Sequence, residues 1–210
     1  MSRGLGDVYK RQTYSQSFFD GKMQNIFFAK DYVNHPNIRQ TDQSTVTGSD
    51  KVQGSTTKNY FGYGTGLRYM FFDPLAVKVS YEHSVRLPIA RELLGNGTTI
   101  YANVALKPEK SNNVNLALFG TWHPAGRHTI YYEANGFLRY VDNYIQTSVI
   151  EKEGMMQFVN DPAVHIKGVE GEIRYDWDGR LQLMANVSYQ DARDQQKYKE
   201  DGKPSATYDN

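Results

Sequence analysis

Residues 85–122 read VRLPIARELLGNGTTIYANVALKPEKSNNVNLALFGTW. A strand is expected to end near Arg86, because Pro88 lacks the N–H that a sheet ladder needs and disfavours helical geometry in the residue before it. The Gly-Asn-Gly at 95–97 is a turn signal. From Asn113 onward, apolar and polar residues alternate, which is typical of a strand with two unlike faces. The stretch therefore predicts an ordered loop that leads into a strand.

The rest of the chain alternates in the same way and has no long apolar run. Its 210 residues are 39% hydrophobic and include 16 Tyr and 10 Phe, while the mean hydropathy is −0.65. No segment stays apolar over the roughly 20 residues that a membrane helix needs. The lack of a long apolar run does not exclude a membrane β-barrel, because the strands of a barrel carry the apolar signal in every second position only.

The net charge and the lack of cysteine exclude further classes of protein and of metal site. The formal net charge is +1, so the chain lacks the basic excess that nucleic-acid binding normally requires, and we predict no nucleic-acid partner. There is no cysteine, which excludes a disulfide framework and a thiolate metal site. The absence of cysteine does not show whether the protein works in an oxidising or a reducing compartment.

Period-two patterning predicts about seven strands. In the segment 59–72, for example, Phe61 and Tyr63 face one way and Gly62 and Gly64 face the other. Charged residues within the spans fall mostly on the polar face. The predicted strands occupy residues 18–33, 59–72, 75–85, 113–122, 129–147, 164–177 and 181–190.

The connections between these strands alternate in length. Short turns are expected at Asp73, Pro124 and Asp178, and long loops after positions 33, 85, 150 and 190. An up-and-down transmembrane barrel has short turns on one side of the membrane and long loops on the other, whereas a soluble meander has no reason to alternate. Aromatic residues next to the short turns fit the interfacial girdle of such a barrel; they are Tyr69, Phe71, Trp122, Tyr175 and Trp177.

We therefore predict an all-β fold, an antiparallel up-and-down transmembrane β-barrel of which this chain supplies a fragment of about seven strands. Large plugged outer-membrane transporters have about 22 strands, so the fragment is about a third of one. Residues 1–12, MSRGLGDVYKRQ, resemble a translated adaptor remnant, and we treat them as a non-native leader outside the fold. Residues 13–210 are assigned to the partial barrel, with the plug and the remaining strands expected elsewhere in the protein.

The pattern of residues 86–111 also resembles a known family. Arg86-x-Pro88, then Glu92-Leu93-Leu94-Gly95, then Asn103, then LKPEKS at 106–111 follow one another as in the barrel of TonB-dependent outer-membrane receptors. The next strand departs slightly, since Asn115 stands where an acidic residue is usual in that family. We expect the motif residues to order an external loop rather than to carry chemistry; they are Arg86, Pro88, Glu92, Gly95, Lys107, Pro108, Glu109 and Ser111.

The resemblance implies energy-coupled import across the bacterial outer membrane. The cargo would be a scarce ligand such as a siderophore or other metal chelate, a cobalamin or a glycan. The TonB energising complex would act through the plug, and outer-membrane lipid would surround the barrel. Loops 34–58, 86–110 and 151–161 would face outside. The candidate ligand contacts in these loops are Lys51, Arg91 and Tyr101.

Two alternatives belong to other classes. A soluble or surface-attached β-sandwich could bind carbohydrate through exposed aromatic residues. An outer-membrane barrel enzyme would need a catalytic constellation, and the sequence offers no nucleophile with an adjacent base. We therefore predict that the chain is not an enzyme and that it binds no cofactor.

Isolated motifs are explained more simply by the barrel. His123 and His128 flank a predicted turn without a third ligand at metal spacing, so no metal site is predicted. Glu170 and Glu172 would lie about 7 Å apart on one face, as in some glycosidases, but lumen-facing polar residues give the same pattern. The glycines at 62, 64 and 66 share one face. This smooth stripe would let a neighbouring backbone or the plug approach closely, or would mark a bend in the strand.

Overall fold

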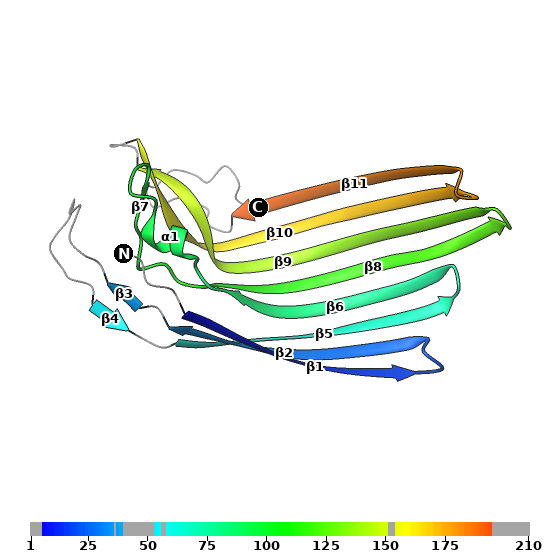
Figure 1. The fold of residues 1–210 in the computed structure, drawn as a ribbon, viewed down its shortest axis with the longest axis horizontal. Coiled ribbons are helices and arrows are strands. Elements are labelled where there is room, and N and C mark those ends of the chain that lie inside the picture. Colours follow the sequence, from blue (N-terminus) through cyan, green and yellow to red (C-terminus); the bar gives the residue numbers. More distant parts are fainter. Residues whose placement is uncertain (1–5, 36, 40–52, 56–57, 151–153, 195–210) are drawn as a thin grey trace.

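A single curved β-sheet makes up most of the protein (Figure 1). The computed structural model describes residues 6–35, 37–39, 53–55, 58–150 and 154–194. In the nine-stranded sheet the main path runs in chain order through β1 (Gly6–Phe18), β2 (Met23–His35), β5 (Lys58–Phe72), β6 (Leu75–Arg86), β8 (Glu109–Ala125), β9 (His128–Ile150), β10 (Met155–Trp177) and β11 (Leu181–Asp194). The short elements are β3 (Asn37–Arg39), which pairs with β4 (Gln53–Ser55), helix α1 (Ala90–Leu94), and β7 (Ile100–Tyr101), which pairs with β10. No helix among the described residues has the length and apolar character needed to cross a membrane.

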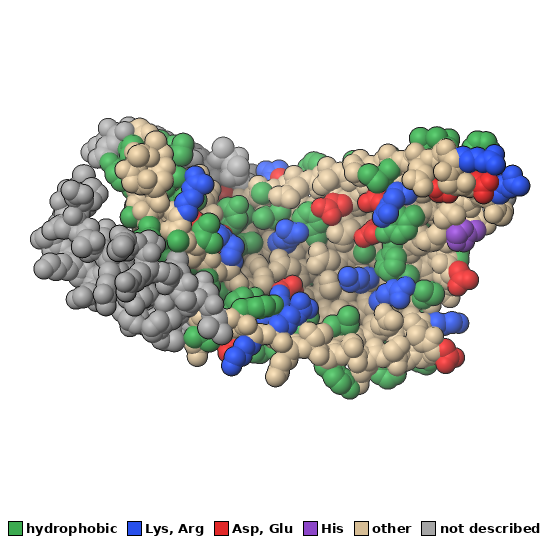
Figure 2. All heavy atoms as spheres, in the orientation of Figure 1, with side chains coloured by type: hydrophobic (Ala, Val, Ile, Leu, Met, Phe, Trp, Pro, Cys, Tyr) green, Lys and Arg blue, Asp and Glu red, His purple; other side chains and the backbone are tan. Residues whose placement is uncertain are grey.

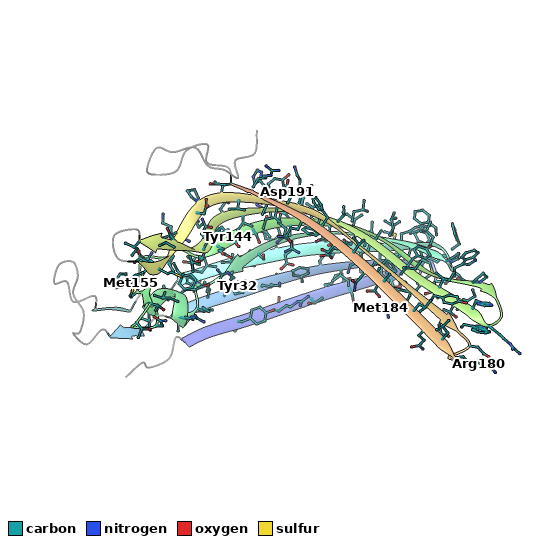
Figure 3. All side chains as sticks on the ribbon, turned by 90° about the horizontal axis from the view of Figure 1, so that it is seen from above. Tyr32, Tyr144, Met155, Arg180, Met184 and Asp191 are labelled. Atoms are coloured by element: carbon teal, nitrogen blue, oxygen red, sulfur yellow. The ribbon has the colours of Figure 1, made fainter. Side chains whose placement is uncertain are left out.

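Neighbouring strands of the main path are antiparallel throughout. β7 is the exception, because it pairs with β10 in parallel. The path ends at β1 on one side and at β11 on the other, so the described strands form an open, curved wall (Figure 3). The predicted all-β, antiparallel up-and-down architecture is confirmed.

The exposed apolar face of this wall distinguishes it from a β-sandwich. A sandwich buries its apolar residues between two sheets packed face to face. Here the long strands belong to one sheet, and large apolar side chains such as Phe61, Leu116 and Val187 are exposed. The alternative of a β-sandwich module is therefore wrong.

Short and long connections lie at opposite ends of the wall. Tight turns join β1 to β2, β5 to β6, β8 to β9 and β10 to β11 at one end, while α1, β3, β4 and β7 lie at the other (Figure 1). Phe71, Trp122 and Trp177 are exposed beside the tight turns, as an interfacial girdle requires. The predicted alternation of connection lengths is confirmed for the long connections from β2 to β5 and from β6 to β8, but β9 and β10 are joined by residues 151–154 alone.

The N-terminal hairpin departs from the sequence prediction of about seven strands. The main path has one further strand, β1, which takes in residues 6–12 and pairs with β2. Residues 6–12 of the predicted leader thus lie within β1, and the adaptor origin of residues 1–12 stays a prediction. The turn after β1 interrupts the predicted strand 18–33, with Asp20 and Gly21 at φ values of 51° and 86°. Flanking aromatic residues made this Asp-Gly turn look like part of one strand.

Strands β9 and β10 extend far beyond their predicted ends. Each has 23 residues, and the ladder continues to the pair Ile150 and Met155. A tilted strand needs only about 9–11 residues to cross a membrane. The predicted loop 151–161 is therefore wrong from position 155 onward, because that part is a strand. At the long-connection end the hairpin therefore extends beyond the length that a membrane-spanning strand needs.

The wall has one apolar and one polar face. Alternate residues of a strand point to opposite faces, and Figure 2 shows acidic and basic side chains spread along the strands between hydrophobic ones. We assign the apolar face to lipid and the polar face to the lumen. Phe61, Leu67, Leu116, Leu118, Val169, Ile173, Leu183 and Val187 lie on the outward face, and Lys78, Glu82, Asn113, Asn115, Glu133, Asn135, Glu170 and Glu172 on the inward face.

The apolar band crosses the strands obliquely. Strand pairing connects Leu67 of β5 with Val169 of β10 in one row across the sheet. On β10 the outward apolar run ends at Val169, where Lys167 follows, but on β5 it continues past Leu67 to Phe61. This is a rise of about 20 Å over four strand spacings of about 4.8 Å, which corresponds to a tilt of about 45°. A closed membrane barrel needs a strand tilt of about this size.

The glycines of β5 make room for side chains of the neighbouring strands. On the inward face the Phe28 ring of β2 lies over Gly64, where a Cβ would overlap the ring and come within 2.7 Å of the Tyr81 carbonyl oxygen. Lys30 of β2 reaches across β5 to Glu82 of β6, with 2.5 Å between Nζ and Oε1. The close neighbours of the glycine stripe are therefore side chains of β2 and backbone carbonyl oxygens of β6, as expected for a close approach of a neighbouring backbone. The approach of a plug to this stripe stays a prediction.

We expect Gly64→Ala to lower the free energy of unfolding by about 2 kcal/mol, because the new methyl group must displace the Phe28 ring and meets the Tyr81 backbone. The matched control is Gly66→Ala on the same face of the same strand, where the nearest atom to a Cβ is 3.8 Å away. Urea unfolding of the full-length protein is the measurement. Adding Phe28→Ala to Gly64→Ala should recover part of the loss. Equal stability of the two single variants would contradict this account.

Candidate functional site

The motif residues form a folded loop at the long-connection end of the wall (Figure 1). β6 ends at Arg86, as predicted, and Pro88 is buried soon after it. Helix α1 follows, and at its first turn the Glu92 carboxylate accepts the Ile89 N–H at 2.9 Å. Gly95 ends the helix at a φ of 67°, where a residue with a side chain is strained. The internal order predicted for this loop is present.

A cluster of one arginine and two glutamates closes the base of the loop. Arg86 donates from Nε and Nη2 to the two carboxylate oxygens of Glu109, at 2.5 and 2.8 Å, and from Nη1 to Glu92 at 2.9 Å. Only 8% of Glu92 and 9% of Glu109 is exposed. Hydrogen bonding to Glu109 raises the pKa of Arg86, burial opposes this, and hydrogen bonding to Glu92 adds to the rise. Arg86 therefore stays charged at any ordinary pH.

Backbone N–H groups complete the coordination of the two carboxylates. Glu109 Oε1 accepts the Ile145 N–H of β9 at 2.7 Å, as Glu92 accepts that of Ile89. One guanidinium faces two buried carboxylates, and the two backbone bonds lower the cost of the second negative charge. The cluster joins the end of β6, helix α1, the start of β8 and β9. This geometry supports the prediction that Arg86, Glu92 and Glu109 order the loop.

Hydrogen bonds also attach the loop to the protruding β9–β10 hairpin. Asn103 Nδ2 donates to the Phe158 carbonyl oxygen at 2.9 Å. Asn160 accepts the Lys107 N–H at 2.8 Å and donates to the Lys107 carbonyl oxygen at 2.9 Å. A small apolar core of Leu93, Leu106, Ile145 and Phe158 lies between the loop and the hairpin. The loop is thus fixed along its length as well as at its two ends.

Two asparagines contribute to this order through their side chains. Asn96 Oδ1 accepts the N–H groups of Thr98, Thr99 and Ile100, at 3.1, 2.9 and 2.8 Å, and so closes the turn predicted at 95–97. Asn160 is a site residue that sequence reasoning missed. Its partner in the loop, Lys107, lies 53 positions away, and the only local signal was the turn-like Asn-Asp-Pro run that begins at this residue.

The three predicted ligand contacts fall in different places. Arg91 is exposed on α1. Tyr101 is half-buried on β7, in register with Gln157 of β10. Lys51 lies outside the described residues. Arg91 and Tyr101 are both part of the folded loop but belong to separate elements, and their role in ligand binding stays a prediction.

The remaining motif residues mark the beginning of β8. Lys107 is exposed and Pro108 is half-buried just before the strand. Ser111 Oγ lies 2.8 Å from Ser84 Oγ of β6. Asn115, where the family usually has an acidic residue, donates to a serine hydroxyl of β6 at 3.3 Å. A neutral amide suits this position because its partner is a neutral hydroxyl.

The inward face of the wall offers a second candidate surface. The Arg174 guanidinium lies over the Tyr131 ring, 4.4 Å from its centroid, and Glu172, which shares this face with Glu170, forms an ion pair with Arg174. These contacts fit a polar lumen wall of mixed charge. A shallow hollow in this wall is lined by Lys78, Ser80, Asn115, Ala117, Phe119, Tyr131, Glu133 and Asn135.

The histidines beside the β8–β9 turn have polar and aromatic neighbours. His128 Nδ1 lies 2.7 Å from the Tyr175 hydroxyl, and the His128 ring stacks on Trp177 with 6.3 Å between centroids. His123 Nδ1 lies 3.2 Å from Thr129 Oγ1. In the part of the chain that the structure describes, no three His, Asp or Glu side chains are grouped so that they could hold a metal ion. His128 thus belongs to the aromatic girdle.

Solved structures of other proteins share this fold, among them the following three. The copper transporter OprC has a TM-score of 0.60 at 18% identity, over 82% of this chain and 26% of that one. The FrpB iron transporter from Neisseria meningitidis has a TM-score of 0.63 at 13% identity, over 96% of this chain and 28% of that one. The Serratia marcescens hemophore receptor HasR, in complex with its hemophore HasA and heme, has a TM-score of 0.59 at 16% identity, over 88% and 33%. At these identities the likeness shows the fold alone.

The chain covers at most 33% of the length of these three proteins. A search of curated proteins gave no match. The family model described as "TonB dependent receptor-like, beta-barrel" matches residues 4–208, which is nearly the whole chain. The match agrees with the tilted apolar band, the alternating connections and the motif loop. The chain therefore belongs to the TonB-dependent receptor family, as part of its β-barrel domain.

Proposed function

We propose that this chain forms part of the barrel of an outer-membrane receptor that imports a scarce ligand by energy-coupled transport. The observation that carries the proposal is the combination of a tilted apolar band with a folded external loop above it. The band suits the chain to lipid, and the loop presents a fixed surface to the outside. The proposed partners are the TonB energising complex, which would act through the plug, and outer-membrane lipid around the barrel.

The cargo class we favour is a metal ion or a metal chelate. The structures of similar fold are described as a copper transporter, an iron transporter and a hemophore receptor bound to heme. A siderophore and a cobalamin both belong to this class, and a glycan is the alternative. Arg91 and Tyr101 on the folded loop, together with Lys51, are the proposed ligand contacts. A fixed loop favours binding because little conformational entropy is lost when the ligand docks.

Cargo and energy coupling can be tested together in cells that lack their own receptors. The full-length receptor is expressed with and without the TonB complex, and uptake of ferric citrate, heme, copper ion, cyanocobalamin and maltodextrin is measured. We expect uptake of one metal-containing cargo that stops when the TonB complex is removed. Uptake that continues without the complex would contradict energy coupling, and uptake of maltodextrin alone would replace the metal class by the glycan.

Arg91→Gln should then raise the cargo concentration needed for half-maximal uptake about tenfold, which corresponds to the loss of one charge-assisted contact of about 1.4 kcal/mol. The yield of folded receptor should not change, because Arg91 is exposed on α1. Arg180→Gln is the matched control, since Arg180 is equally an exposed arginine but lies in a tight turn at the opposite end. Equal effects of the two substitutions would remove Arg91 from the proposed contacts.

A further inference from the structure

A hollow on the outward face lies where the apolar band of β9–β11 ends. Its lining includes Leu138, Tyr140, His165, Lys167 and Arg193. Strand pairing places Lys167 between Leu138 and Asp191, and His165 between Tyr140 and Arg193. Paired residues share a face, so these side chains all lie on the lipid side. Asp191, near the end of β11 toward the long connections, marks the level of the hollow in Figure 3.

Two exposed cations border this hollow, with one carboxylate recessed between them. The side chains of Lys167 and Arg193 are 57% and 43% exposed, against 18% for Asp191. Arg193 Nε donates to the two Asp191 oxygens at 2.8 and 3.0 Å, and Lys167 Nζ lies 3.9 Å from Asp191. One carboxylate thus positions both cations and balances one of them. The next acid on this face, Asp142 of β9, is in register with Lys110 of β8. Lys167 and Arg193 thus place two cations against the single carboxylate of Asp191 at this border.

The position of the hollow along the strands indicates what it binds. On its membrane side, Val169 and Tyr189 are exposed parts of the apolar band. On its other side, the β9–β10 hairpin rises beyond the membrane. The hollow therefore lies at the depth of the lipid headgroups on the long-connection side. Cations at this depth attract anionic headgroups.

Phosphate suits these side chains better than a carboxylate, because its several oxygens can accept hydrogen bonds from a lysine, an arginine and a histidine together. The Tyr140 and His165 rings meet edge to face, with 4.5 Å between centroids, and form the side of the hollow. Directly below, Leu138 and Val169 offer an apolar wall to an acyl chain of the same molecule. A free anion would use the cations but not this wall.

We propose that this hollow binds the phosphate group of an outer-leaflet lipid, with Lys167 and Arg193 as the phosphate ligands. Tyr140 and His165 flank the headgroup, and the apolar band below takes the acyl chain. The proposal rests on the outer-membrane placement of the proposed function and is independent of the cargo. Loss or change of cargo uptake therefore leaves it untouched, and the test below involves no transport.

The test uses the full-length receptor in phosphatidylcholine nanodiscs that contain either bis-phosphorylated lipid A or the same lipid A after phosphatase treatment. Native mass spectrometry measures how much of each lipid stays bound. The wild type should retain the phosphorylated lipid preferentially. Lys167→Gln/Arg193→Gln should bind it about 30-fold more weakly, as expected for the loss of two cations near a membrane surface.

Two control variants keep the result interpretable. Arg127→Gln/Arg180→Gln removes the same charge from the tight turns at the opposite end and should bind as the wild type does. Lys167→Arg/Arg193→Lys keeps both charges and should retain the lipid, which separates loss of binding from loss of folding. Equal retention of the two lipids by the wild type, or unweakened binding by the Gln variant, would overturn the proposal. So would binding of inorganic phosphate as tight as that of the lipid.

Discussion

Replacing Arg86 with glutamine is expected to destabilise the external loop by about 3 kcal/mol. The substitution removes the guanidinium that donates to Glu92 and Glu109, and both carboxylates are almost fully buried. Buried carboxylates without their cation are costly, because burial penalises the charged form. Amide hydrogen exchange in α1 and β7 of the full-length receptor should then accelerate about 100-fold, since local opening costs less by that amount.

Arg91→Gln is the matched control, because it removes an arginine from the same loop at an exposed position. Its exchange rates should equal those of the wild type, although it should weaken cargo uptake. Arg86→Lys should recover only part of the protection, because an ammonium group cannot bond both oxygens of Glu109 in the fork geometry of a guanidinium. Identical exchange in Arg86→Gln and Arg91→Gln would show that the ion cluster does not order the loop.

The membrane part of the fold could be predicted because each spanning strand has its own local signal. In residues 59–72, apolar side chains alternate with glycines and Arg68, and this period follows from lipid on one side and lumen on the other. The extension of β10 from Met155 has no such signal, because a ladder outside the membrane does not need an apolar outward face. Its pairing with β9 became visible only through the register of the whole hairpin.

The candidate site was predictable to the extent that its residues belong to a local pattern. Arg86, Glu92 and Glu109 could be singled out, but the bond from Glu109 to the Ile145 N–H depends on how β8 aligns with β9. The residues that line the outward hollow could not be predicted from a local pattern either. Lys167 and Arg193 are far apart in sequence, and they meet only because His165 pairs with Arg193 across β10 and β11.

Gly95 and Gly97 form a matched pair that tests how tightly the loop is folded. Both have a positive φ, 67° and 72°, so alanine carries a backbone cost of about 1 kcal/mol at either position. At Gly95 a Cβ would also overlap the Ile100 carbonyl oxygen and lie 2.9 Å from the carbonyl carbon. At Gly97 nothing lies within 4 Å of a Cβ. Ile100 cannot easily yield, because it is buried and paired with Met156 of β10.

Gly95→Ala is therefore expected to destabilise the loop by about 3 kcal/mol, against about 1 kcal/mol for Gly97→Ala. The difference in destabilisation between the two variants comes from the steric overlap at Gly95, because the backbone cost is common to both. Hydrogen exchange in α1 and β7 measures the two variants against the wild type, and it should show the larger acceleration for Gly95→Ala. If the two variants exchange alike, β7 can move away from the helix end without losing its pairing with β10. The loop would then be a yielding surface rather than a fixed one, and Arg91 and Tyr101 could not act as pre-positioned ligand contacts.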